Sequence, residues 1–135
     1  ARNQGFHVLD TSTNMFPAYQ GGSFAASHKW AAENPDALKG YIRAYLKGLE
    51  WTLDPANREA ASALLQKNMP EIRPQVVGAV LTSLLSPRSG LTPKASMLMD
   101  GVDIVLDLRS RYGKGVTLSD PSKYIDLKYY EAALA

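Results

Sequence analysis

Four prolines, each directly after a polar residue, divide this chain into helix-sized segments. The pairs are Asn34-Pro35, Asp54-Pro55, Thr92-Pro93 and Asp120-Pro121. Proline fits the first turn of a helix, because the N–H that it lacks would have no intrahelical acceptor there. Asn, Asp and Thr are typical of the position before it, where a side-chain oxygen accepts a hydrogen bond from an unpaired N–H. The four pairs therefore predict four starts of helices or turns.

The segments around these pairs carry apolar residues at helical spacing. In the clearest, Leu38, Ile42 and Leu49 fall on one face, and Lys39 and Lys47 fall on the other. The same pattern predicts helices over residues 35–53, 55–68, 73–85, 93–112 and 127–134, with a further turn or two of helix over 27–33.

Two short apolar runs near the N-terminus are interpreted as strands. Residues 6–9 precede a polar cluster at 10–14, and residues 23–27 follow the pair Gly21-Gly22. Two strands alone do not make a stable sheet. We therefore expect their ladder partners to lie in a part of the protein outside this chain.

Composition narrows the functional classes. Hydrophobic residues make up 45% of the chain and charged residues 21%, which indicates a globular protein. The net charge of +2 gives no basic stripe, so we expect no nucleic-acid partner. There is no cysteine, which excludes disulfides, thiol nucleophiles and thiolate metal sites in this chain. No apolar run approaches the roughly 20 residues of a membrane span.

No pattern of residues predicts catalysis or metal binding. His7 and His28 are far apart and lack partners at metal-ligand spacing, so both are interpreted as structural or surface residues. The carboxylates of Asp100, Asp103 and Asp107 are spaced as on a solvated helix face. We expect no catalytic residue, no metal, no cofactor and no enzymatic activity.

Three basic side chains allow two interpretations. Lys94, Arg109 and Arg111 could meet an anionic ligand, but ordinary surface or helix-end charge is the favoured interpretation.

One loop combines residue types that suit ligand binding. It holds Phe16, Tyr19, Gln20, Gly21, Gly22 and Ser23. Aromatic rings supply flat apolar walls, and glycines let a ligand reach backbone N–H groups. A hydrophobic hinge loop explains the same residues equally well.

Several segments of the sequence, taken in order, resemble one protein family. They are residues 5–10, 19–27, 34–36, 48–51, 54–60, 90–93, 105–110 and 120–126, together with Trp30. No single segment is specific for the family. Taken together in this order and spacing, the segments cover nearly the whole chain. Together they resemble the C-terminal half of solute-binding proteins of the nitrate/sulfonate/taurine/thiamine-pyrimidine importer family.

The resemblance implies an α/β fold, the C-terminal part of a type II two-lobed periplasmic binding protein. This part would be helix-rich, with two short strands near its N-terminus. Residues 1–27 would form the lobe-crossover strands and the cleft loop. Residues 28–135 would form the helical part, which mostly covers the first lobe. The N-terminal half, with its signal peptide, would be missing here.

The function implied is that of a substrate-binding subunit of an ABC-type importer in the periplasm. It would capture a small molecule between two lobes and deliver it to a membrane permease. The ligand would be an anion such as nitrate, a sulfonate, a pyrimidine or an aromatic acid. The loop would face it at the cleft mouth, with Phe16 or Tyr19 stacking, Gln20 hydrogen-bonding, and Gly21 and Gly22 exposing N–H groups. The broad apolar faces of the helices would need to be covered by the missing half, or by a swapped copy of the chain.

Two alternatives stay open. One is a thiamine-pyrimidine biosynthetic enzyme of the same fold, whose cysteine-rich iron-binding segment this chain lacks. The other is a non-catalytic helical interaction module, which would need no strands and no cleft.

Overall fold

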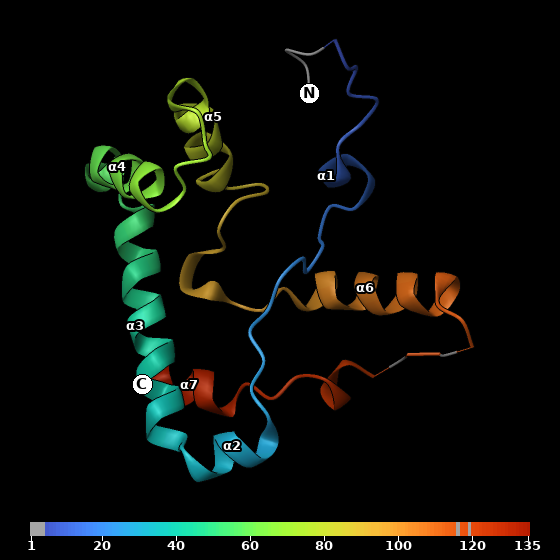
Figure 1. Cartoon of the computed structure of the whole chain (residues 1–135). Coiled ribbons are helices and arrows are strands. Elements are labelled where there is room, and N and C mark those ends of the chain that lie inside the picture. The colour runs from blue at the N-terminus through green and yellow to red at the C-terminus, as the bar shows by residue number, and fades with distance from the viewer. Residues whose placement is uncertain (1–4, 116, 119) are drawn as a thin grey trace. The chain divides into compact units, whose positions relative to one another are not determined.

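The computed structural model describes residues 5–115, 117, 118 and 120–135. Its regular elements are all helices, and no strand occurs in these described ranges (Figure 1). The α-helices are α1 (Ser12–Met15), α2 (His28–Glu33), α3 (Pro35–Leu53), α4 (Arg58–Asn68), α5 (Pro74–Leu84), α6 (Met99–Tyr112) and α7 (Lys128–Leu134). Within the described residues, short 3-10 helices lie between them: η2 (Pro55–Asn57), η3 (Pro93–Ala95) and η4 (Pro121–Lys123).

The expectation of two short strands, and with it the α/β type II fold, is wrong for the described chain. Residues 6–9 and 23–27 are non-helical but form no ladder. Their apolar side chains point to solvent, with Phe6 66% and Leu9 98% exposed. β-propensity expresses how well a side chain fits a paired, half-buried surface. Without a partner strand, the same residues give only irregular chain.

The four proline pairs are confirmed as starts of helices or turns. Pro35, Pro55, Pro93 and Pro121 lie in the first turns of α3, η2, η3 and η4. The carboxylates of Asp54 and Asp120 each accept a hydrogen bond from the backbone N–H two residues later. The Asn34 side chain acts differently, because its Nδ2 donates to the Trp30 carbonyl and so closes α2.

Most of the expected helices agree with the structure to within a few residues, and α3 agrees at both ends. The exception is the helix expected over 93–112, because α6 begins only at Met99. Lys94 and Ala95 have left-handed backbones, with φ of 57° and 49°, and Leu98 is extended. The short helix α1 lies in a segment that the sequence indicated as loop.

The chain forms two compact units. Unit 1 holds the described residues up to Ala25 together with those of Met97–Asp126, and unit 2 holds Ala26–Ser96 and Leu127–Ala135. In unit 2, α7 packs against α3, and α4 packs against α5 (Figure 1). The roles expected for residues 1–27 and 28–135 in a two-lobed protein stay predictions.

The buried residues of each unit are few. In unit 2 they are Ala31, Leu49, Ala61, Val77, Leu81 and Ala133, and in unit 1 Gly101 and Val102. Several large side chains of α3 and α5 remain accessible, including Trp51 at 38% and Leu84 at 37% exposed. No polar side chain is buried among the described residues. That the chain needs a covering partner stays a prediction.

Candidate ligand-binding loop

The predicted binding loop begins where α1 ends, in unit 1. The Phe16 N–H donates to the Ser12 carbonyl at 2.7 Å and closes the helix. The rings of Phe16 and Tyr19 then pair, with centroids 6.2 Å apart and planes tilted by 44°. Phe16 is half-buried, whereas Tyr19 is 49% exposed. The pair therefore offers one accessible ring beside a half-buried one.

The start of α1 is fixed by an acidic side chain just before the loop. One oxygen of Asp10 accepts from the Thr11 N–H at 2.7 Å and from Asn14 Nδ2 at 2.8 Å. The hydrogen bond from Asn14, and then that from Thr11, holds the pKa of the Asp10 carboxyl below its usual range. These bonds keep α1, and with it Phe16, at one end of the loop.

Gln20 ties the loop to the start of α6. Its Nε2 donates to the Gly22 carbonyl at 2.5 Å, and its Oε1 accepts from the Leu98 N–H at 3.0 Å. Leu98 is the N-cap of α6, so its N–H lies outside the helix ladder and needs another acceptor. Gln20 is half-buried and acts as a positioning residue in this structure. Its predicted bond to a ligand stays a prediction.

Gly101 lets the loop approach α6 closely. It lies buried in the first turn of α6. A Cβ at this position would lie 2.7 Å from the Gln20 nitrogen and 3.0 Å from the Tyr19 carbonyl carbon. Sequence analysis did not identify this residue, although a glycine inside a helical pattern is a signal of close packing.

Gly21 and Gly22 are not required by the loop's own backbone. Neither has a left-handed φ, and a Cβ at Gly22 would meet nothing within 4 Å. Both residues and Ser23 are exposed, and their N–H groups have no acceptor within the described part of the chain. One explanation for the two glycines remains: without side chains, they leave space for another group to approach the backbone.

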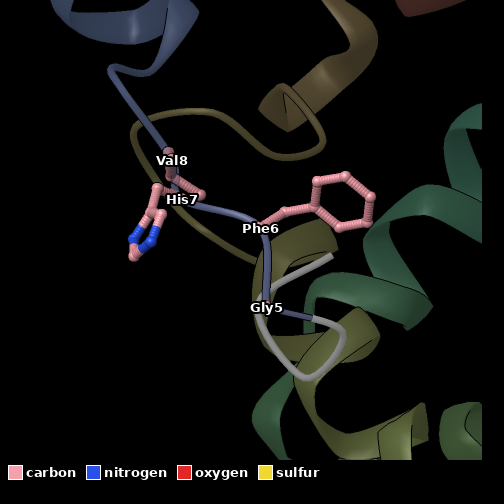
Figure 2. Close-up of a pocket in the computed structure, with 4 residues that line it drawn as sticks. All are labelled: Gly5, Phe6, His7 and Val8. Atoms are coloured by element: carbon pink, nitrogen blue, oxygen red, sulfur yellow. The ribbon is translucent and has the colours of Figure 1, made fainter.

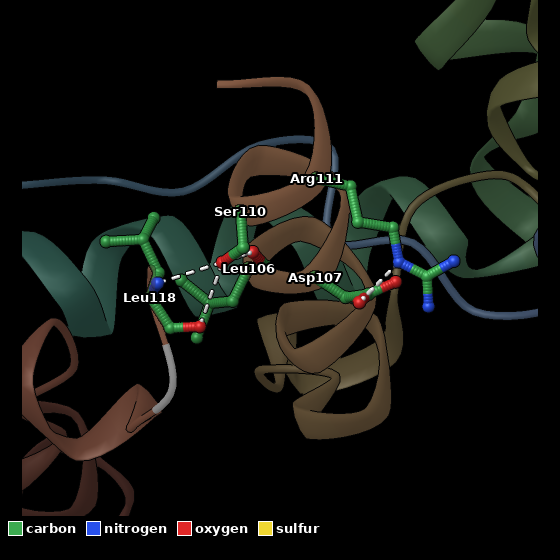
Figure 3. Close-up of polar contacts among 5 residues, drawn as sticks. All are labelled: Leu106, Asp107, Ser110, Arg111 and Leu118. Atoms are coloured by element: carbon green, nitrogen blue, oxygen red, sulfur yellow. Dashed lines mark hydrogen bonds and ion pairs between the residues drawn. The ribbon is translucent and has the colours of Figure 1, made fainter. Parts of the chain in front are cut away.

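The far end of α6 is held to the segment that follows it. Ser110 Oγ accepts from the Leu118 N–H at 2.8 Å, and can donate to the carbonyls of Leu106 or Leu118 (Figure 3). The next residue, Arg111, pairs through its guanidinium with Asp107, one turn earlier on α6, at 2.8 Å (Figure 3). This end of unit 1 carries structural contacts.

A surface hollow of about 400 Å³ lies beside residues 5–8. Its lining is four consecutive exposed residues, and Figure 2 shows the Phe6 ring and the His7 imidazole on opposite sides of the chain. A ligand site needs several polar groups that converge from different segments. The hollow lacks them, so it does not compete with the loop as a candidate site.

The remaining charged candidates lie at exposed positions of both units. Asp100, Asp103 and Asp107 are all exposed on α6. Lys94 belongs to unit 2, whereas Arg109 and Arg111 belong to unit 1. Within the described residues, no three His, Cys, Asp or Glu side chains are placed to hold a metal ion.

The comparisons identify no relative. No protein-family model, no curated protein and no solved structure matches this chain. In the part of the chain that the structure describes, none of the helices combines the length and the apolar character of a membrane span. The family resemblance therefore rests on the sequence segments alone.

Proposed function

We propose that this chain belongs to the substrate-binding subunit of an ABC-type importer and that residues 16–23 contact the solute. In this role the subunit captures a small molecule in the periplasm and delivers it to a membrane permease. The observation that supports this proposal is the structure of the loop. An accessible Tyr19 ring lies on a backbone that Gln20 fastens to α6, and the neighbouring N–H groups of Gly21 and Gly22 have no acceptor among the described residues.

The chemistry of the loop favours a flat solute with a hydrogen-bond-accepting edge. Tyr19 presents a ring face, and the N–H groups of Gly21 and Gly22 supply donors. No Lys or Arg occurs between Phe16 and Ser23, so an anion would meet no opposite charge there, and a bare inorganic anion has no ring to stack on Tyr19. Among the solutes implied by the resemblance, a pyrimidine or an aromatic acid fits these groups better than nitrate.

A thermal-shift screen of the protein in its full natural length tests the proposal. The probes are 4-aminopyrimidine, benzoate, taurine and nitrate, each over a wide concentration range. A solute present at 100 times its Kd stabilises the folded state by about 2.7 kcal/mol. We expect a rise in Tm with 4-aminopyrimidine or benzoate. An unchanged Tm with all four would count against solute capture.

A helical interaction module remains the second candidate, because of the outer face of α3. Gly40, Ala44 and Gly48 are exposed there, and a Cβ at either glycine would meet nothing within 4 Å. Glycine inside a helix costs about 0.5–1 kcal/mol relative to alanine, so its presence calls for a reason such as close packing. Light scattering across a concentration series checks this candidate. Self-association that Gly48→Leu abolishes, with no response to any solute, would favour it.

A further inference from the structure

Two consecutive residues of unit 2 occupy a backbone region that side chains disfavour. Lys94 and Ala95 have φ of 57° and 49°. In this left-handed region the Cβ crowds the following carbonyl oxygen, and glycine is the usual occupant. Such outliers persist only where the surroundings hold them in place. The contacts of this turn therefore show what maintains it.

The turn is held from within, by packing of η3 on α3 and by α7. The Ala95 N–H donates to the Thr92 carbonyl at 2.9 Å, which closes the turn itself. The Tyr130 hydroxyl of α7 donates to the Lys94 carbonyl at 2.8 Å. This second bond joins residues 36 positions apart, so it forms only while α7 is in place.

The position of α7 depends in turn on α3. Arg43 Nη2 donates to the Ala132 carbonyl at 3.2 Å, and its Nε to the Ala133 carbonyl at 3.4 Å. These are carbonyls of the last turn of α7, which lack N–H donors within the helix. Ala133 is buried in the same contact region. Docking of α7 on α3 therefore places the Tyr130 hydroxyl.

The strained turn sits where the chain leaves unit 2. Ser96 is the last residue of this stretch of unit 2, and Met97 is the first of the next stretch of unit 1. A change of φ at Lys94 or Ala95 redirects every atom that follows. The backbone at these two residues therefore sets the direction in which the chain departs.

We infer that residues 92–96 form a latched conformational switch, with the Tyr130 hydroxyl as its latch. While α7 is docked, the latch keeps Lys94 and Ala95 left-handed. When α7 lifts, the bond breaks, the turn relaxes to negative φ and the chain leading to Met97 is redirected. The inference rests on contacts inside unit 2 and is independent of solute binding.

Trypsin cleavage after Lys94 measures how often the turn opens, because Lys94 is exposed. Tyr130→Phe removes only the hydroxyl and is expected to raise the cleavage rate about fivefold, the effect of losing one hydrogen bond. Tyr129→Phe is the matched control on the same helix, since the Tyr129 hydroxyl makes no hydrogen bond to the described residues. Equal cleavage rates for the two variants would overturn the latch.

Ala95→Gly tests the strain separately and keeps the trypsin site. Glycine adopts a positive φ without steric cost, so the variant should raise Tm by about 3 °C. Ala95→Gly removes the strain at one of the two residues, so the turn gains less by relaxing and the cleavage rate after Lys94 should fall both in the natural sequence and in the Tyr130→Phe variant. A lowered Tm, or a cleavage rate that Ala95→Gly leaves unchanged, would show that the turn is no switch.

Discussion

Gly101 on α6 and Gln20 in the loop approach each other so closely that no side chain fits between their backbones. A Cβ on Gly101 would lie 2.7 Å from the Gln20 nitrogen, which is inside van der Waals contact. Gln20 also accepts a hydrogen bond from the Leu98 N–H at the start of the same helix. The loop that carries Tyr19 is therefore seated on α6 both by packing and by a hydrogen bond.

Gly101→Ala should unseat the loop. The added methyl group collides with backbone atoms, which cannot rotate away, so we expect a loss of about 1–3 kcal/mol in the free energy of unfolding. Urea denaturation measures this loss. Gly48→Ala on α3 is the control, because a Cβ there meets nothing within 4 Å. It should stabilise by about 0.5–1 kcal/mol. Two variants of equal stability would contradict the close approach.

Gln20→Ala should expose the Leu98 amide to solvent. The N–H of Leu98 has Gln20 Oε1 as its acceptor at 3.0 Å. Without this bond its hydrogen exchange, followed by NMR, should accelerate about fivefold or more. Gln20→Glu keeps an acceptor for Leu98 but loses the donor to the Gly22 carbonyl, so exchange at Leu98 should stay slow in that variant. Fast exchange in natural Gln20 protein would refute the bond.

Arg43→Ala should loosen the C-terminal helix. It removes the donors to the carbonyls of Ala132 and Ala133, and we expect a cost of about 1 kcal/mol in unfolding free energy. Amide exchange along α7 should rise together with that loss. Lys47→Ala, an exposed cation on the same helix, is the control and should leave α7 unchanged. Equal exchange in both variants would mean that Arg43 does not hold α7.

Asp120 should titrate at unusually low pH. The Ser122 hydroxyl, and then the Ser122 N–H, hold the pKa of the Asp120 carboxyl below its usual value of 3.8. Because the folded-state pKa is lowered, the stabilisation is present above pH 3.8 and is lost as the pH falls through the folded-state pKa. An NMR titration of the Asp120 carboxyl should show this low pKa. Ser122→Ala should return it toward 3.8, and no change would refute the contact.

The sequence predicted those parts of the fold that depend on local chemistry. Proline after a polar residue marked the starts of α3, η2, η3 and η4, and apolar spacing predicted α3 at both ends. These signals are local because a proline nitrogen or a helical face needs no distant residue to act.

The parts that failed depend on distant partners. A strand exists only through its ladder, so residues 6–9 and 23–27 carried β-propensity but formed no strand. The late start of α6 at Met99 coincides with the bond from the Leu98 N–H to Gln20, which is 78 positions away. Within the loop, residue types predicted the candidate site, whereas the positioning role of Gln20 and the close approach of Gly101 required the structure.

Isothermal titration of the protein in its full natural length with benzoate and 4-aminopyrimidine tests the central claim most directly. Tyr19→Ala removes the accessible ring and should raise the Kd about tenfold without lowering Tm. Tyr112→Ala, which removes an 81% exposed tyrosine elsewhere in unit 1, should leave the Kd unchanged. A Kd that is the same in Tyr19→Ala, Tyr112→Ala and the natural protein would contradict solute capture by this loop.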